Sequence, residues 1–377
     1  MKFSQILANL HTKEHLINSA TTGRISHAQL FHAFPGTGAL AMALAYAQFI
    51  NCLSPIVSDS CGTCSSCIKY EKLSHPDLHF IFPVANTEKI KDAASINFIE
   101  TWRKCFLANP YFTINDWLDQ IDVENRQLSI KEEEATTIIR NLSYKSFEAK
   151  LKVCIIWMAE KMSVITSNKL LKVLEEPPDN TLFILIAENT EKLLPTIISR
   201  TQLVYIPKPD DDMLKQWMLS KKNISAVEAN RIIRLCDSNI SAIGQALQNE
   251  EFDFPHEEKF LEWMRVCLRP LKKAKELVDM TNELAELKRE GIKQFLIFSI
   301  ETVRECLIFN HGAKNLQRFN DEVFKNFSVF APYITQNNIE GFTKELTSAY
   351  NQIERNANPK ILFYDLTFKL ASLIVKK

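Results

Sequence analysis

The sequence is poor in glycine, in long apolar runs and in net charge of either sign. Glycine supplies only 8 of its 377 residues, which favours a mostly helical protein with few tight turns. The 45 basic and 45 acidic side chains cancel, so the chain as a whole is not an electrostatic nucleic-acid binder, although a local basic patch stays open. The most apolar stretch, 182–187, has the length of a strand and is far too short to span a membrane.

The first residues lack the apolar run of a signal peptide, since Lys13 and Glu14 come before one has begun. We therefore expect a cytoplasmic protein without a membrane partner. In that compartment the nine cysteines are expected to be free thiols or metal ligands rather than disulfides. A hydrophobic content of 46% is enough for full cores, and the length predicts two or three domains.

Residues 30–50 have the layout of a phosphate-binding loop from which the reacting side chains are missing. The pattern predicts the end of a buried strand, a turn rich in Pro and Gly, and a helix over 39–50. A working loop reads G-x-x-x-x-G-K-[ST], in which the Lys contacts the β/γ-phosphates and the hydroxyl contacts magnesium. Here Ala33, Ala39 and Leu40 replace the first Gly, the Lys and the hydroxyl residue. An ordinary turn between a strand and a helix gives the same pattern, so this stretch alone leaves both interpretations open.

Strands and helices alternate through the later part of the core. Apolar runs of strand length and helical patterns follow one another in the order 152–157, 163–174, 181–187, 191–199 and 202–206. This alternation predicts a parallel α/β sheet with right-handed crossovers. In an NTPase the first of these strands would end in carboxylates that hold magnesium, but Trp157 and Met158 stand there. Glu160 follows on the next turn, where we expect a solvated surface carboxylate.

Four cysteines give the most specific signal in the chain. Cys61, Cys64 and Cys67 follow one another at x2 spacing, and Cys52 precedes them by nine residues. Four thiolates complete a tetrahedral shell around Zn²⁺, and such a closed shell is structural because no position remains for water. An iron–sulfur cluster is an alternative, although the usual nearby fourth Cys followed by Pro is missing, and a disulfide pair or unrelated surface thiols fit less well. The other cysteines are in apolar settings and are expected to be core thiols: Cys105, Cys154, Cys236, Cys267 and Cys306.

Arg200 lies at the end of a predicted helix, in the run Ser199-Arg200-Thr201 just before a strand. Its guanidinium can neutralise the negative C-terminal end of that helix, which is a common role. It can also reach a phosphate bound by a neighbouring subunit, as an arginine finger supplied in trans. On these residues alone the helix-end role is favoured, because it is the commoner of the two.

Composition divides the chain into three parts. Pro207 and Pro209, with the aspartates that follow them, mark a boundary. Beyond it, apolar residues at helical spacing and very few glycines indicate helices. We expect, in order, an α/β core over 1–206 with a cysteine module at 52–67, a small helical unit over 207–250, and a helical region over 255–377.

Two further stretches of the core carry no motif that points to chemistry. Residues 85–128 contain Trp102 and Trp117, and we expect them to form covering helices inserted into the core. The acidic run 132–134 opens a predicted helix, where it suits the helix dipole. We expect this run to form a solvated face.

Together these segments resemble the clamp-loader subunits of bacterial DNA polymerase III, which belong to the AAA+ class. The resemblance covers about 1–205 strongly and the remainder in outline. It rests on the four-cysteine insertion and on the runs 25–31, 74–77, 168–178, 197–200 and 354–360. It implies a RecA-like parallel sheet with an inserted zinc module, followed by a small helical lid and a C-terminal helical collar that oligomerises.

Within that family, the missing loop Lys and the missing acidic pair point to the delta-prime class, which does not hydrolyse ATP. The resemblance implies a partner of tau/gamma and delta subunits in a hetero-pentamer, which helps to load the sliding clamp onto primer–template DNA. Such a chain is not an enzyme on its own but a component of the DNA polymerase III holoenzyme.

The resemblance also assigns site residues. Arg200, beside Ser199, would complete the ATP site of an adjacent tau/gamma subunit, although Thr201 replaces the Cys that usually follows. No Arg stands in the lid segment 237–242, where an ATP-sensing one would be expected. A structural Zn²⁺ would be held by Cys52, Cys61, Cys64 and Cys67. No functional ATP site is expected at Gly36, Thr37, Gly38, Ala39 and Leu40.

Two other functions stay open on the sequence. One is an active clamp-loader-type ATPase with a divergent phosphate loop, which would bind ATP as an isolated chain. The other is a zinc-ribbon adaptor outside replication, which would not associate with tau/gamma subunits or with the clamp.

Overall fold

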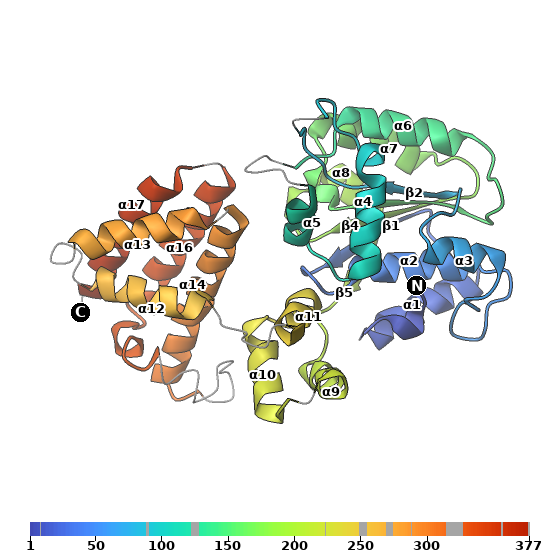
Figure 1. Cartoon of the computed structure of the whole chain (residues 1–377). Helices are drawn as coiled ribbons and strands as arrows, with labels where there is room; N and C mark the ends of the chain where they lie inside the picture. The colour runs from blue at the N-terminus through green and yellow to red at the C-terminus, as the bar shows by residue number, and fades with distance from the viewer. Residues whose placement is uncertain are drawn as a thin grey trace. The chain divides into compact units, whose positions relative to one another are not determined.

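The computed structural model describes residues 1–7, 9–87, 90–121, 128–222, 224–248, 255–268, 274–287, 289–313, 327–355 and 357–375. The chain divides into two compact units, Met1–Gln248 and Asn249–Lys377, and each is considered by itself (Figure 1). The first contains the sheet and the candidate sites, and the described part of the second is helical.

The first unit is built on a five-stranded parallel sheet of order β2-β3-β4-β1-β5. Its central strands β3 (Lys152–Trp157) and β4 (Thr181–Ala187) are buried at every residue, as expected of apolar strands covered on both faces. Strand β1 (Ala28–Ala33) lies between β4 and β5 (Gln202–Ile206), and β2 (Leu78–Ile81) forms the other edge. The predicted parallel α/β sheet is therefore confirmed, including the bounds of β3, β4 and β5.

Helices cover both faces of this sheet (Figure 1). On one face, α2 (Ala39–Ile50) is buried at every residue, because its many alanines allow close packing on β1, β3 and β4. Helix α1 (Leu10–Thr21) packs against α2. On the other face, the sheet packs against α6 (Glu132–Ser143), α7 (Val164–Glu175) and α8 (Pro195–Ile198).

The predicted insertion forms α4 (Ser95–Ala108) and α5 (Ile114–Ile121), while 88–89 and 122–127 lie outside the described residues. Its Trp102 and Trp117 are fully buried and contact the ring of Phe82. The Trp117 indole N–H also donates to the Pro83 carbonyl at 2.9 Å. The expectation of covering helices is confirmed.

The solvated face expected for the acidic run is wrong for Glu134. Its carboxylate accepts the hydroxyl of Ser95 at 2.7 Å and also the Ser95 backbone N–H, and so it satisfies a free amide at the start of α4. Burial raises the pKa of Glu134. The partner lies 39 residues away, so the local charge pattern gave no sign of it.

Three short helices end the first unit: α9 (Asp211–Lys221), α10 (Ala226–Leu235) and α11 (Ile240–Gln248), which we call the lid. The Asp210 side chain accepts the backbone N–H groups of Asp212 and Met213, so the aspartate-rich boundary is the N-cap of α9.

The second unit is helical in its described parts, as predicted for 255–377. Its core is aromatic, and the indole N–H of the buried Trp263 donates to Thr367 at 2.8 Å. None of the described helices is long and apolar enough to cross a membrane. Its long helices are α12 (Pro255–Cys267), α13 (Ala274–Glu286), α14 (Arg289–Asn310), α16 (Ile339–Glu354) and α17 (Pro359–Val375).

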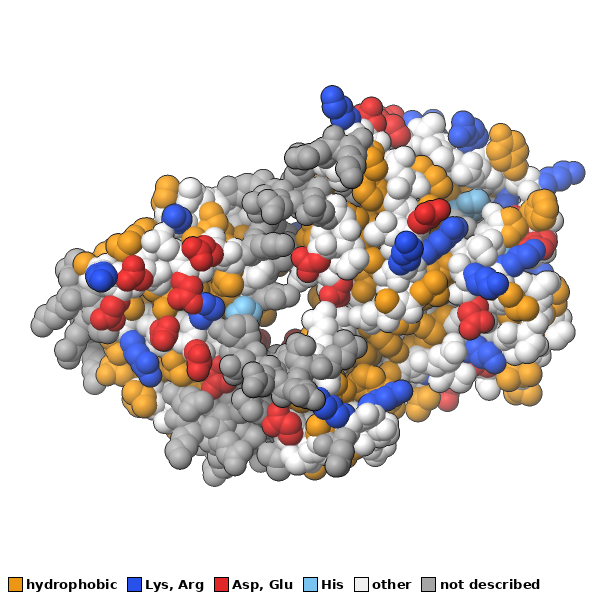
Figure 2. Space-filling model, viewed as in Figure 1, with side chains coloured by type: hydrophobic (Ala, Val, Ile, Leu, Met, Phe, Trp, Pro, Cys, Tyr) orange, Lys and Arg blue, Asp and Glu red, His pale blue; other side chains and the backbone are white. Residues whose placement is uncertain are grey.

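Charged side chains of both signs are interspersed on the face of the molecule drawn in Figure 2. This distribution agrees with the cancelling totals of the sequence. A strong field that would gather nucleic acid is produced when one sign is clustered on one face.

Candidate functional site

The loop between β1 and α2 has the strand–turn–helix layout that the sequence predicts. Gly36 and Gly38 have φ values of 69° and 89°, in the left-handed region that favours glycine. The Thr37 hydroxyl donates to the Phe34 carbonyl at 2.7 Å and closes the turn. Helix α2 then begins at Ala39, as predicted. We call residues 34–38 the phosphate loop.

The space in front of both glycines is taken by side chains of the same chain. A Cβ added to Gly38 would lie 2.6 Å from the ring of Tyr111, and one added to Gly36 would overlap the side-chain amide of Asn239. The Ile240 backbone N–H also donates to the Gly36 carbonyl at 3.1 Å. The phosphate loop is therefore covered by the insertion on one side and by the lid on the other.

Tyr111 is held in place at both ends. Its hydroxyl accepts the backbone N–H of Leu7 at 2.7 Å, and its own N–H donates to the Asn109 side chain at 3.0 Å. Burial raises the pKa of the Tyr111 phenol. The ring is thus a fixed part of the loop's surroundings.

The same insertion is fastened to the lid. Asn109 donates to the Ser241 hydroxyl at 2.8 Å, and that hydroxyl lies 3.1 Å from one carboxylate oxygen of Asp116. The other Asp116 oxygen accepts the Gln245 side-chain N–H at 2.7 Å. Sequence reasoning left 85–128 without a role and missed these residues, because no local spacing relates Asn109 or Asp116 to α11.

The end of β3 is apolar, as the sequence indicated. Trp157 is buried against Phe112, with ring centroids 4.8 Å apart, and Met158 is also buried. The solvated surface carboxylate expected for Glu160 is wrong. Its Oε1 accepts the backbone N–H groups of Glu188 and Asn189 at 3.0 and 3.3 Å, its Oε2 is buried, and burial raises its pKa. The short turn after β3 directs this side chain to the end of β4.

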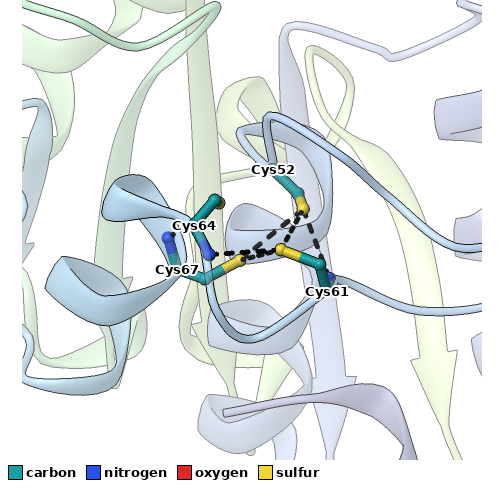
Figure 3. A group of neighbouring side chains, drawn as sticks. All are labelled: Cys52, Cys61, Cys64 and Cys67. Atoms are coloured by element: carbon teal, nitrogen blue, oxygen red, sulfur yellow. Dashed lines mark hydrogen bonds between the residues drawn. The ribbon is translucent and has the colours of Figure 1, made fainter.

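The four predicted cysteines lie together where the end of α2 meets α3 (Ser65–Glu71) (Figure 3). The Sγ atoms of Cys52, Cys61 and Cys67 are separated by 3.5 to 3.8 Å, and all four sulfurs lie within 4.8 Å of one another. A tetrahedral zinc with Zn–S bonds of about 2.3 Å places its sulfurs about 3.8 Å apart. The residues therefore fit a metal of this kind.

Backbone amides favour negative charge on part of the cluster, whereas burial raises the pKa of the Cys52 and Cys67 thiols. The N–H groups of Thr63 and Cys64 donate to the Cys61 sulfur at 3.4 and 3.3 Å and lower the pKa of that thiol to about 5. Helix α3 begins directly after Cys64, whose sulfur accepts the Cys67 N–H at 3.4 Å. Such bonds favour the thiolate, which is the form that binds a metal.

Two aspartates near the cluster, Asp59 and Asp77, accept backbone N–H groups from distant segments. Asp59 accepts the backbone N–H groups of Phe3 and Ser4, both at 3.0 Å, and so ties the module to the start of the chain. The run 74–77 supplies Asp77, which accepts three backbone N–H groups of residues 147–149. The other five cysteines lie outside the cluster, and all but the half-buried Cys105 are buried.

Arg200 lies on the surface just beyond α8. Its Nη1 donates to the Thr196 carbonyl at 3.0 Å, so it does meet the C-terminal end of that helix. Its Nε donates to the Glu175 carboxylate at 2.5 Å, and Nη2 pairs with the same carboxylate. The Ser199 hydroxyl lies 3.4 Å from Nη1. About a third of the side chain, 34%, stays exposed.

Comparison with known proteins gives the family. A family model described as DNA polymerase III, delta subunit, matches residues 8–210. The DNA polymerase III subunit delta' of Bacillus subtilis is 29% identical over 241 residues, which is 63% of this chain and 58% of that protein. The tau subunit of Escherichia coli is 27% identical over 216 residues, 57% of this chain and 27% of that protein.

A solved structure of a gamma subunit-related protein from Thermotoga maritima aligns over 96% of this chain and 99% of its own, at 14% identity and a TM-score of 0.43. The match to the Bacillus subtilis delta' subunit spans less than two thirds of that relative's length. One of the relatives that this chain matches is thus a delta' subunit. Because the family model covers more than half of the sequence, the chain belongs to the DNA polymerase III delta subunit family.

Proposed function

We propose that this protein is a delta-prime subunit of a DNA polymerase III clamp loader, which does not hydrolyse ATP itself and completes the ATP site of a neighbouring tau/gamma subunit with Arg200. One observation carries the proposal. The chain's own phosphate loop is filled by Tyr111 and Asn239, whereas Arg200 stays at the surface.

The side chains at the loop support the proposed absence of hydrolysis. Phosphoryl transfer needs a Lys on the phosphates, a hydroxyl and a carboxylate on magnesium, and an oriented water. Ala39, Leu40 and Trp157 stand at three of these positions, and all are buried. A nucleotide would also have to displace Tyr111 and break the bond between Ile240 and Gly36.

The fastened lid supports a fixed role in the assembly. A ligand can shift a conformational equilibrium only by binding one state more tightly than another. Because a side chain of the insertion lies at the loop in place of a nucleotide, no nucleotide binding can change the conformation of the lid. The core over 1–206 and the lid over 207–250 then keep one conformation during the ATP cycle of the neighbouring subunits. The collar over 255–377 joins this chain to the other subunits of the clamp loader.

The four cysteines hold a structural zinc. Cys52, Cys61, Cys64 and Cys67 supply a closed shell of thiolates, and the metal supplies no chemistry beyond joining the module to the end of α2. The sulfur separations, between 3.5 and 3.8 Å for three of the pairs, support zinc.

Arg200 acts on a neighbour rather than on this chain. A guanidinium supplied in trans stabilises the charge on the phosphoryl group in the transition state, which is worth about 10³–10⁵ in rate. The partners would be tau/gamma and delta subunits in a hetero-pentamer. The product would be a sliding clamp on primer–template DNA, so the chain would serve catalysis only within the holoenzyme.

The test is the DNA-stimulated ATPase rate of the reconstituted complex. Arg200→Ala should leave assembly intact and lower this rate, whereas Arg140→Ala, at an exposed position near the end of α6, should not. An unchanged rate with Arg200→Ala would refute the finger. Micromolar ATP binding by the isolated chain would favour the active ATPase, and failure to co-purify with tau/gamma and the clamp would favour the adaptor.

A further inference from the structure

Arg200 is engaged by a carboxylate from the end of another helix. Glu175 is the last residue of α7, and α7 packs against α8, just beyond which Arg200 lies. The Nε and Nη2 groups of Arg200 both donate to Oε1 of Glu175. The Nη1 group faces the other way, toward the Thr196 carbonyl at 3.0 Å.

The edge of the guanidinium that Glu175 covers is one that a phosphate would use. Arginine binds carboxylate and phosphate through the same fork, with two parallel N–H groups directed at two oxygens. One such fork is formed by Nε and Nη2, and both already point at Glu175. The remaining nitrogen is turned toward the end of α8. A phosphate oxygen and the Glu175 carboxylate therefore compete for one edge.

The contact is weak enough to be exchanged. The side chains of Arg200 and Glu175 are 34% and 46% exposed, and exposed ion pairs contribute little because water and salt screen them. The carboxylate nevertheless restricts a long side chain that has many rotamers. Glu175 thus holds the guanidinium in one place without fixing it there permanently.

We propose that Glu175 is a positioning residue, which holds Arg200 in the free chain and is displaced when the guanidinium meets the phosphate of an ATP bound by the neighbouring subunit. This inference rests on the proposed function of Arg200 as a finger. It adds that Arg200 is bound to Glu175 before the subunits assemble. The guanidinium must therefore leave Glu175 before it can bind the phosphate.

The first test is the ATP dependence of the reconstituted clamp loader. Glu175→Gln keeps the size of the side chain and removes its charge, so the half-saturating ATP concentration should fall by about two- to fivefold while kcat changes little. Glu176→Gln removes the same charge from the next residue, which is exposed, and should change neither quantity. The effect of Glu175→Gln should shrink as salt is raised, because an exposed pair is screened.

The second test uses the free chain and needs no ATPase activity. The Nε–H proton of Arg200, identified by its loss in Arg200→Lys, should exchange with water faster in Glu175→Gln than in the wild-type chain. Equal exchange would show that the pair does not form and would overturn the inference.

The two proposals fail in different ways. If Arg200→Ala leaves the ATPase rate of the complex unchanged, the finger itself is refuted. If Arg200→Ala lowers that rate but Glu175→Gln leaves the half-saturating ATP concentration unchanged, only the competition between Glu175 and phosphate is refuted.

Discussion

The phosphate loop and the Arg200 surface, to which we assign two proposed parts of ATP chemistry, differ in how far the chain covers them. Side chains from the insertion and the lid fill the loop, where Tyr111 and Asn239 lie against its glycines. Arg200 has one exposed carboxylate partner and remains reachable from outside. Under the proposed function, the difference teaches that an inactive loop differs from a working one by more than its missing side chains, since Tyr111 and Asn239 lie against its glycines.

The largest effect is expected at the four-cysteine module. This module follows α2, the helix that begins at the phosphate loop. Cys67→Ser should abolish binding of about one zinc per chain and make residues 52–75 sensitive to protease, because structural zinc contributes about 10 kcal/mol or more. Metal analysis and limited proteolysis measure both effects. Cys105→Ser, outside the cluster, is the matched control. Iron with visible absorbance in the wild-type chain would contradict the zinc assignment.

The next prediction asks whether Tyr111 itself blocks the loop. Restoring the Lys and the hydroxyl residue with Ala39→Lys and Leu40→Thr should give no ATP binding while Tyr111 remains. Adding Tyr111→Ala to this pair should produce binding that a fluorescent nucleotide titration detects, because the ring no longer lies over Gly38. ATP binding by the double variant as tight as that by the triple variant would show that Tyr111 does not block the loop.

A smaller effect is expected where the insertion holds the lid. Asp116→Ala removes the carboxylate that meets Ser241 and Gln245, which should cost about 1–2 kcal/mol. Hydrogen exchange in α11 should become faster, with Arg200 unaffected. Asp119→Ala, at an exposed position in the same helix, should leave the exchange unchanged. Similar exchange in both variants would argue against fastening by Asp116.

The smallest effect expected is a pH dependence from Glu160. Burial raises its pKa in the folded state, so the folded chain binds the proton more tightly, and stability falls as the pH rises from the unfolded to the folded pKa. Glu160→Gln does not titrate, so its stability relative to wild type should increase across that interval. Urea unfolding at about pH 4 and about pH 7 measures this. The exposed Glu191→Gln should give no such trend, and a trend of opposite sign would contradict the raised pKa.

The sequence was sufficient where the determining pattern is local. Strands β3 and β4 are continuous apolar runs, and burial on both faces of a parallel sheet requires such runs. The cysteines could be assigned from spacing, because a short turn brings Cys61 and Cys64 within reach of one ion. The roles of Arg200 and of the four thiolates stay predictions: the four sulfurs lie together, and Arg200 lies at the surface.

The sequence was insufficient where distant segments meet. Tyr111 bonds to Leu7, 104 residues away, and no periodicity or motif relates the two. The acidic run predicts a solvated face for Glu134, because such runs usually lie there. A buried carboxylate needs donors, and its donors come from Ser95. Pairings of this kind become visible only once the chain is folded.

The bond between the Ile240 N–H and the Gly36 carbonyl bears on whether the conformation of the lid depends on the ATP concentration. A bound nucleotide stabilises a protein by mass action, in proportion to the logarithm of its concentration. The groups that occupy this loop are covalently part of the chain, so their local concentration does not change with metabolism. The lid of this protein would therefore keep the same conformation at high and at low ATP concentration.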